Sequence, residues 1–187
     1  ATIIGSKPGE FIADRNNITR VWMDHGVWPC ITTKLYLDET GDYDLLWKEA
    51  PYFLDKQVMR GEATDEDWEA KAEKKHTGTV LEHLLLQNLT AFYDVGEHNI
   101  IRLRGADWND ALDMAKEKGE SVAFTNAYAQ NLEDLAGLLR IAKERGINSI
   151  VVAERMIPLF NMGADLYDSV EKKYELLQSF LENCVTE

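Results

Sequence analysis

Two aspartates, an asparagine and a tryptophan lie side by side near the middle of the sequence, as Asp107-Trp108-Asn109-Asp110. If this stretch enters a helix, Asp107 and Asp110 face the same side, and each carboxylate disfavours the charge of the other. One of them would then stay protonated near neutral pH, as a general acid must be to protonate a glycosidic oxygen. Trp108 offers a flat apolar surface to a sugar ring, and Asn109 can hydrogen-bond hydroxyl groups. The stretch therefore predicts carbohydrate chemistry.

The same four residues also permit a purely structural interpretation. Asp and Asn are preferred N-caps, so the stretch could begin a helix whose tryptophan packs in the core, and spacing alone favours this capping interpretation. Glu120, which follows Gly119, likewise permits both a functional and a structural interpretation. An acid there can order an active-site loop or contact sugar, or it can be an ordinary residue of a first helical turn.

The elements that must position these residues are predicted to be helices. Apolar residues recur at helical spacing over residues 27–40, 79–96, 122–145 and 164–185. Thr79 is expected to cap the second helix, and Gly41 and Gly146 to end the first and third. Strand-like alternation is weak, so we predict an all-α fold. Helix pairs joined by aromatic and acidic loops suit a toroid that places its loops around one cleft, with the 105–121 loop on a rim.

The segments between these helices are predicted to be irregular. Residues 1–26 are interpreted as mostly loop, Asp44 to Val58 as a short helix or a pair of turns, and residues 60–78 as a solvated linker. A brief helical turn is expected at residues 111–114, and the β-branched run Ile147 to Val152 is short enough to continue as helix. His83 is expected to be a hydrogen-bonded helix histidine, and His98 to be exposed to solvent.

Composition excludes several classes of partner. Acidic residues outnumber basic ones by 33 to 20, and a net charge of -13 would repel nucleic acid. No apolar run approaches the roughly 20 residues that span a bilayer. The two cysteines show no metal or disulfide pattern. We expect a globular protein of the reducing cytoplasm that binds no metal, nucleic acid or membrane.

Several motifs in the same order carry a family resemblance. Gly105 to Asp110 followed by Gly119-Glu120-Ser121-Val122 resembles the signature of glycoside hydrolase family 94, which includes cellobiose, cellodextrin, chitobiose and 1,2-β-oligoglucan phosphorylases. The similarity extends over further segments between about residue 21 and residue 140: Met23–Pro29, Tyr36–Leu46, Glu49–Tyr52 and Thr79–His83.

The resemblance implies a fold and roles for particular residues. The fold would be an (α/α)6 toroid, present here only in part. Asp110 corresponds to the family's general acid and Trp108 to a sugar-contacting residue. Further substrate-binding residues are expected among the neighbours of the motif and in the stretch near the sugar subsites: Asp107, Arg104, Glu120, Asp24 and His25. The chain departs from the family pattern in two places, at Ala111-Leu112 after the motif and at Gly26-Val27 after His25. Within the family, these features favour the 1,2-β-oligoglucan phosphorylases.

The resemblance further implies inverting phosphorolysis of a β-glucoside of the β-1,2-glucan, cello- or chito-oligosaccharide type. Inorganic phosphate would be the co-substrate, no cofactor would be needed, and the product would be an α-sugar 1-phosphate. Two alternatives stay open: an inverting hydrolase on the same toroid, and a non-catalytic sugar-binding or scaffold module. We expect residues 1–187 to be a single segment of a helical catalytic domain, truncated at both ends and inactive alone, from a parent that could be a homodimer. The phosphate-binding residues would lie outside it.

Overall fold

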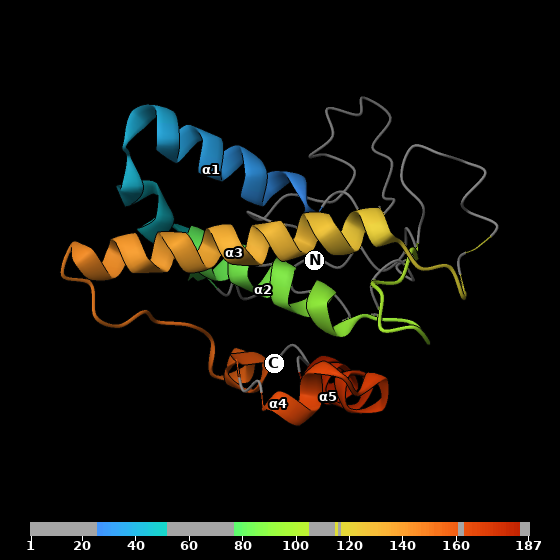
Figure 1. Ribbon diagram of the computed structural model, residues 1–187. Helices are drawn as coiled ribbons and strands as arrows, with labels where there is room; N and C mark the ends of the chain where they lie inside the picture. The colour runs from blue at the N-terminus through green and yellow to red at the C-terminus, as the bar shows by residue number, and fades with distance from the viewer. Residues whose placement is uncertain (1–25, 52–76, 105–114, 116, 161–162, 184–187) are drawn as a thin grey trace.

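A largely buried helix, α2 (Val80–Tyr93), lies at the centre of the computed structural model, which describes residues 26–51, 77–104, 115, 117–160 and 163–183 (Figure 1). The long helix α3 (Val122–Glu144) and the C-terminal helix α5 (Val170–Asn183) both contact α2. The first helix, α1 (Trp28–Thr40), packs on α3. Figure 1 shows α1 on one side of α3, with α4 and α5 on the other side beyond α2.

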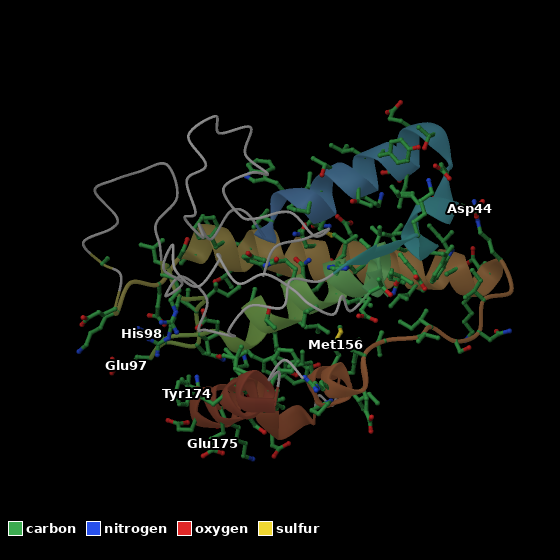
Figure 2. All side chains as sticks on the ribbon, turned by 180° about the vertical axis from the view of Figure 1, so that it is seen from behind. Asp44, Glu97, His98, Met156, Tyr174 and Glu175 are labelled. Atoms are coloured by element: carbon green, nitrogen blue, oxygen red, sulfur yellow. The ribbon has the colours of Figure 1, made fainter. Side chains whose placement is uncertain are left out.

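Shorter elements connect these helices. They are the 3₁₀ helices η3 (Tyr43–Trp47) and η6 (Glu154–Phe160), the strands β1 (Glu49–Pro51) and β2 (Thr77–Thr79), and the short helix α4 (Ala164–Tyr167). Asp44 of η3 and His98, which follows α2, lie toward opposite ends of the molecule (Figure 2). No helix in the described part of the chain combines the length and the apolar character that a membrane span requires.

The sequence of α2 explains both its start and its central place. The Thr79 hydroxyl accepts a hydrogen bond from the backbone N–H of Glu82 at 3.1 Å, which confirms the predicted N-cap. Apolar side chains lie on nearly all sides of the helix, and a helix of this kind belongs in a core. Its buried residues include polar ones as well: Val80, Leu81, Glu82, His83, Leu84, Leu85, Gln87, Asn88, Leu89, Ala91 and Tyr93.

The boundaries of α1 and α3 also follow local signals. Gly41 adopts a left-handed conformation (φ 69°), and its N–H donates to the carbonyl of Leu37 at 2.9 Å, which ends α1 as predicted. The Ser121 hydroxyl accepts from the N–H of Phe124 at 3.2 Å and caps α3. Gly146, with φ 88°, follows the end of α3. These three positions need no tertiary contact to act, so the sequence locates them well.

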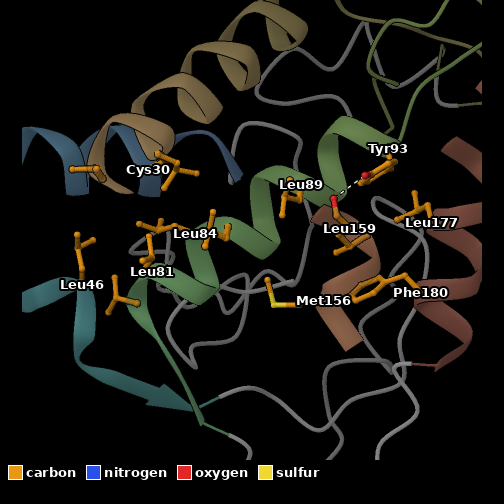
Figure 3. Close-up of a cluster of buried hydrophobic side chains, with 14 of the residues drawn as sticks. Cys30, Leu46, Leu81, Leu84, Leu89, Tyr93, Met156, Leu159, Leu177 and Phe180 are labelled. Carbon is orange, nitrogen blue, oxygen red and sulfur yellow. Dashed lines mark hydrogen bonds between the residues drawn. The ribbon is translucent and has the colours of Figure 1, made fainter. Parts of the chain in front are cut away.

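Side chains from every layer meet in two hydrophobic clusters. The larger one joins α1, η3, α2, α3, η6 and α5, and it includes Leu46, Leu84, Met156 and Phe180 (Figure 3). Within it, the hydroxyl of Tyr93 donates to the carbonyl of Leu159 at 2.7 Å. The smaller cluster lies where α2 ends and α1 and α3 begin: Val27, Ala91, Val95, Ile101 and Tyr128. This second cluster supports the chain that leads toward the acidic motif.

A small antiparallel sheet corrects part of the sequence interpretation. Strands β1 and β2 pair with Ala50 opposite Gly78. Residues 49–51 therefore form a strand where a helix or turns are expected, and residues 77–78 form a strand where a linker is expected. Each strand has only three residues, which is too short for an alternating pattern to be visible. The expectation of turns is correct for η3, and helices make up most of the described residues, in agreement with the all-α class.

Three further expectations about helix continuity are wrong. Residues 164–185 do not form one helix, because α4 ends at Tyr167 and α5 begins at Val170. The run Ile147 to Val152 is irregular rather than helical, since Gly146 has already turned the chain. Helix α2 ends at Tyr93, before the predicted stop at Gly96, because Val95 pairs with Ile101 as an isolated bridge. The expectations for residues 1–25, 52–58, 60–76 and 111–114 lie outside the described residues, as does the rim position expected for residues 105–114.

Candidate active site

The acidic motif falls within residues 105–114, which lie outside the described residues, and the structure describes the chain on either side of it. Arg104 precedes the loop, and Ala115 and residues 117–121 follow it. Five of the predicted site residues lie outside the described residues: Asp24, His25, Asp107, Trp108 and Asp110. The other two, Arg104 and Glu120, lie at the two ends of the loop. The described residues therefore show how the chain is held on the two sides of the motif.

Residues 101–104 and 117–121 form the base of the loop, which we call the loop stem. The N–H of Leu103 donates to the carbonyl of Gly119 at 2.8 Å, and the N–H of Ser121 donates to the carbonyl of Ile101 at 2.8 Å. Arg102 and Glu120 form an antiparallel bridge between these bonds. The ladder is too short for a sequence pattern to reveal it. It brings the start of α3 next to the chain that leaves α2.

Gly119 makes the close approach in the stem possible. Its N–H donates to the carbonyl of Ala115 at 2.6 Å. A Cβ atom at position 119 would lie 2.5 Å from that carbonyl oxygen and 3.2 Å from the Cβ of Leu103. Backbone atoms cannot move aside as a flexible side chain can, so only glycine fits here.

A buried ion pair ties the stem to the core helix. Asp94, the C-cap residue of α2, accepts two hydrogen bonds from the Arg104 guanidinium, from Nη2 to Oδ1 at 2.9 Å and from Nε to Oδ2 at 3.2 Å. Only 2% of Asp94 and 7% of Arg104 are exposed to solvent. Two parallel bonds of this kind fix both distance and orientation. The predicted substrate-binding role of Arg104 stays a prediction.

The backbone of Arg104 is strained. Its φ of 50° lies in the left-handed region, which costs a residue with a Cβ roughly 1–2 kcal/mol. Such a conformation persists only where surrounding contacts hold it. The bonds to Asp94 are contacts of that kind, and the strained residue stands immediately before Gly105, the first residue of the family signature.

Glu120 orders a turn beside the stem. Its carboxylate accepts the N–H of His98 at 3.0 Å and lies 2.6 Å from the His98 ring Nδ1. The pair raises the pKa of His98; burial would raise the pKa of Glu120, but the bonds from His98 together lower it. A Cβ at Gly96 would lie 2.3 Å from this carboxylate. Glu120 thus orders a loop and precedes the cap of α3, while sugar contact stays a prediction.

The turn that Glu120 orders is also tied to the C-terminal helices. The side-chain amide of Asn99 donates to the carbonyl of Tyr167 at 2.9 Å, and Nζ of Lys173 donates to Oδ1 of Asn99 at 2.8 Å. His98 itself is exposed as predicted, with 74% of its side chain accessible to solvent. One face of the turn is therefore solvated, and the other is anchored.

The polar residues in the first turn of α2 have structural partners. Nε2 of His83 lies 3.1 Å from the carbonyl of Ala50, which confirms a hydrogen-bonded helix histidine. Burial lowers the pKa of His83, and the bond to Ala50 opposes that shift. The Glu82 carboxylate accepts the N–H of Ala153 at 3.1 Å. These residues join β1 and the 147–153 segment to α2.

Sequence reasoning missed Asp94 altogether. The available signal was an acidic residue directly after a strong helix, with two arginines following closely at positions 102 and 104. In the described residues, no group of three or more His, Cys, Asp or Glu side chains could hold a metal ion. The described geometry holds the residues before and after the segment that contains Asp110 together at the end of α2.

Comparisons with known proteins agree with the motifs. Residues 10–173 match the sequence model of the glycosyl hydrolase 94 superfamily, catalytic domain. The chain is also similar to solabiose phosphorylase from Paenibacillus borealis, with 32% identity over 130 residues. That match covers 68% of this chain and 14% of the relative, so the chain spans a small part of the relative's length. Since the family match covers most of the sequence, the chain belongs to the glycosyl hydrolase 94 superfamily, whose catalytic domain is an (α/α)6 toroid.

Proposed function

We propose that the protein containing this chain is an inverting glycoside phosphorylase in which Asp110 is the general acid. The observation that carries the proposal is the family match over residues 10–173, which includes the whole acidic motif and both halves of the loop stem. The similarity to a solabiose phosphorylase supports phosphorolysis over hydrolysis. The chain covers 14% of that relative, so the proposal concerns the complete protein.

The proposed reaction breaks one bond and forms one. A phosphate oxygen attacks the anomeric carbon from the face opposite Asp110, and the bond from that carbon to the glycosidic oxygen breaks. Asp110 gives its proton to the departing oxygen, which leaves as a sugar hydroxyl. The products are an α-sugar 1-phosphate and a shortened saccharide. Phosphate is already an anion, so no second carboxylate has to deprotonate the nucleophile, whereas an inverting hydrolase needs one about 6.5–9.5 Å away.

The remaining predicted residues take supporting roles in this proposal. Trp108 stacks on a sugar ring, and Asp107 bonds its hydroxyl groups. Arg104 and Glu120 contact the saccharide or order the loop that does, and Asp24 and His25 line a sugar subsite. The partners are an oligosaccharide and inorganic phosphate, without a further cofactor. A cytoplasmic location and a homodimeric parent belong to the same proposal, and the buried free thiol of Cys30 is compatible with a reducing compartment.

The decisive experiment assays the full-length protein on β-glucosides with and without inorganic phosphate. The substrates should include solabiose, the substrate named for the relative, together with β-1,2-glucan, cello- and chito-oligosaccharides. We expect cleavage only with phosphate and release of an α-sugar 1-phosphate. Equal cleavage in its absence would establish the hydrolase alternative.

Replacement of Asp110 by Asn tests the assignment of the acid. The variant keeps the shape of the side chain but has no proton to donate, so turnover should fall by about 10²–10⁴-fold. Substrate binding should change much less. Full turnover by Asp110→Asn would contradict the catalytic role, and a complete lack of turnover in the wild-type protein on every substrate would favour the non-catalytic module.

A further inference from the structure

Asp94 connects the core helix to the loop stem through both its side chain and its backbone. Its N–H continues α2 by donating to the carbonyls of Thr90 and Ala91, each at 3.2 Å. Its own carbonyl accepts the N–H of Arg102 at 2.9 Å. Its carboxylate holds the guanidinium of Arg104 with two bonds. A single buried residue therefore belongs at once to α2 and to the support of the loop.

The other end of the loop is linked to the same place. The Arg102 side chain donates from Nε to the carbonyl of Val95 at 2.9 Å and from Nη1 to the carbonyl of Glu117 at 3.2 Å. Its Nε also lies 4.0 Å from Oδ1 of Asp94. The two arginines thus bring the residues before and after the loop to one point, the C-terminal end of α2.

The surroundings make this connection rigid. Helix α2 is packed by α3 and α5, so its last turn cannot shift without disturbing the core. Asp94 and Arg104 are both almost fully withdrawn from water, where a charge-assisted pair is strong and the loss of either partner is costly. The strained φ of Arg104 is held by these same contacts.

We propose that Asp94 is a positioning residue for the general acid, and that it acts through Arg104 on the loop that bears Asp110. The inference rests on the proposed function, because it takes Asp110 as the acid. Asp94 touches neither substrate nor phosphate in this proposal. It holds Arg104, the residue immediately before the motif, at the end of α2. Proton transfer depends steeply on the position of the acid, since a displacement of about 1 Å can cost roughly 10²-fold in rate.

A positioning role makes a prediction that a merely structural role does not. The sugar released from an oligosaccharide is a poor leaving group and needs the proton of the acid. A nitrophenyl β-glycoside leaves as a stable nitrophenolate anion and hardly needs it. Loss of Asp94 should therefore reduce turnover of the oligosaccharide far more than turnover of the nitrophenyl glycoside, with KM values changed little.

The experiment compares Asp94→Asn with wild type in the full-length enzyme on both substrates, with phosphate present. We expect kcat on the oligosaccharide to fall by about 10²-fold and kcat on the nitrophenyl glycoside by less than about 10-fold, as for a partly lost acid. Asp94→Glu, which keeps the charge and should fold even if Asp94→Asn does not, should show the same inequality to a smaller degree. The double variant Asp94→Asn/Arg104→Gln should lose little more than Asp94→Asn, because the two residues act as one unit.

Glu82→Gln is the matched control, since Glu82 is a buried carboxylate in the first turn of the same helix. It should reduce thermal stability without separating the two substrates. Equal losses on both substrates for the Asp94 variants, or the same separation in Glu82→Gln, would overturn the proposal. The phosphate dependence of the wild-type enzyme tests the proposed function independently, because the comparison of leaving groups concerns the acid step alone.

Discussion

The two ends of α2 use buried polar side chains in different ways. At the N-terminal end, Glu82 and His83 bond to backbone groups of Ala153 and Ala50, so they join segments of the scaffold. At the C-terminal end, Asp94 bonds to the charged side chain of Arg104, which leads directly into the acidic motif. The difference separates residues that hold the fold together from residues that place a functional loop. Variants at the two ends should therefore fail in different ways.

The largest effect is expected for Arg104→Met. This change leaves the carboxylate of Asp94 buried without its main partner, and breaking a buried pair in this way costs about 3–5 kcal/mol. Urea denaturation of the full-length protein measures the loss. The double variant Asp94→Leu/Arg104→Met removes both charges and should recover much of the stability while turnover of oligosaccharides stays low. If turnover of oligosaccharides recovers as well, the Asp94–Arg104 pair only stabilises the fold and does not position the acid.

Gly119→Ala should give the next largest effect. The new methyl group would press against the carbonyl of Ala115, and such overpacking costs about 1–3 kcal/mol. Gly137→Ala is the matched control, because position 137 lies within α3 and the nearest atom to a Cβ there is an Arg140 nitrogen at 4.0 Å. That change should stabilise the protein by roughly 0.5–1 kcal/mol. Equal melting temperatures for the two variants would contradict the close contact in the stem.

Thr79→Ala tests the scaffold end of α2 with a smaller change. It removes the side-chain bond to the N–H of Glu82, and loss of an N-cap costs about 1 kcal/mol. Thermal denaturation should show this loss, while the ratio of turnover on oligosaccharide and nitrophenyl glycoside should equal that of wild type. A shifted ratio would mean that both ends of α2 position the loop.

The smallest effect is a pH dependence that comes from His98. Glu120, and more weakly Glu97, raise the pKa of His98 above its ordinary value of 6.5, so protonated His98 stabilises the folded protein. This contribution is complete below pH 6.5 and is lost as the pH rises through the raised pKa. The stability difference between wild type and His98→Ala should thus shrink toward alkaline pH. A difference that stays constant from pH 6 to pH 9 would show that the pair contributes no pH dependence.

Local signals account for the parts of the fold that were predicted correctly. Gly41, Thr79 and Gly146 act within a few residues of themselves, and the apolar periodicity of α2 and α3 is dense enough to mark both helices. The pairing of β1 with β2 joins segments far apart in the chain through three residues each, and no local pattern announces it. The break between α4 and α5 was missed because the apolar residues of 164–185 keep helical spacing across it.

The sequence by itself determined the main helices, because caps and periodicity are properties of neighbouring residues. It also determined the family, because the motif around Asp110 retains its residue types and their order. Only the tertiary structure decided which acidic residues are buried and what they hold. Little in the sequence distinguishes Asp94 from the other acidic residues of this chain. It differs from them because α3 and α5 pack around α2 and because the loop stem brings Arg104 within hydrogen-bond distance of its carboxylate. Burial and pairing of a charge arise from segments that meet in space, and no stretch of sequence contains that information.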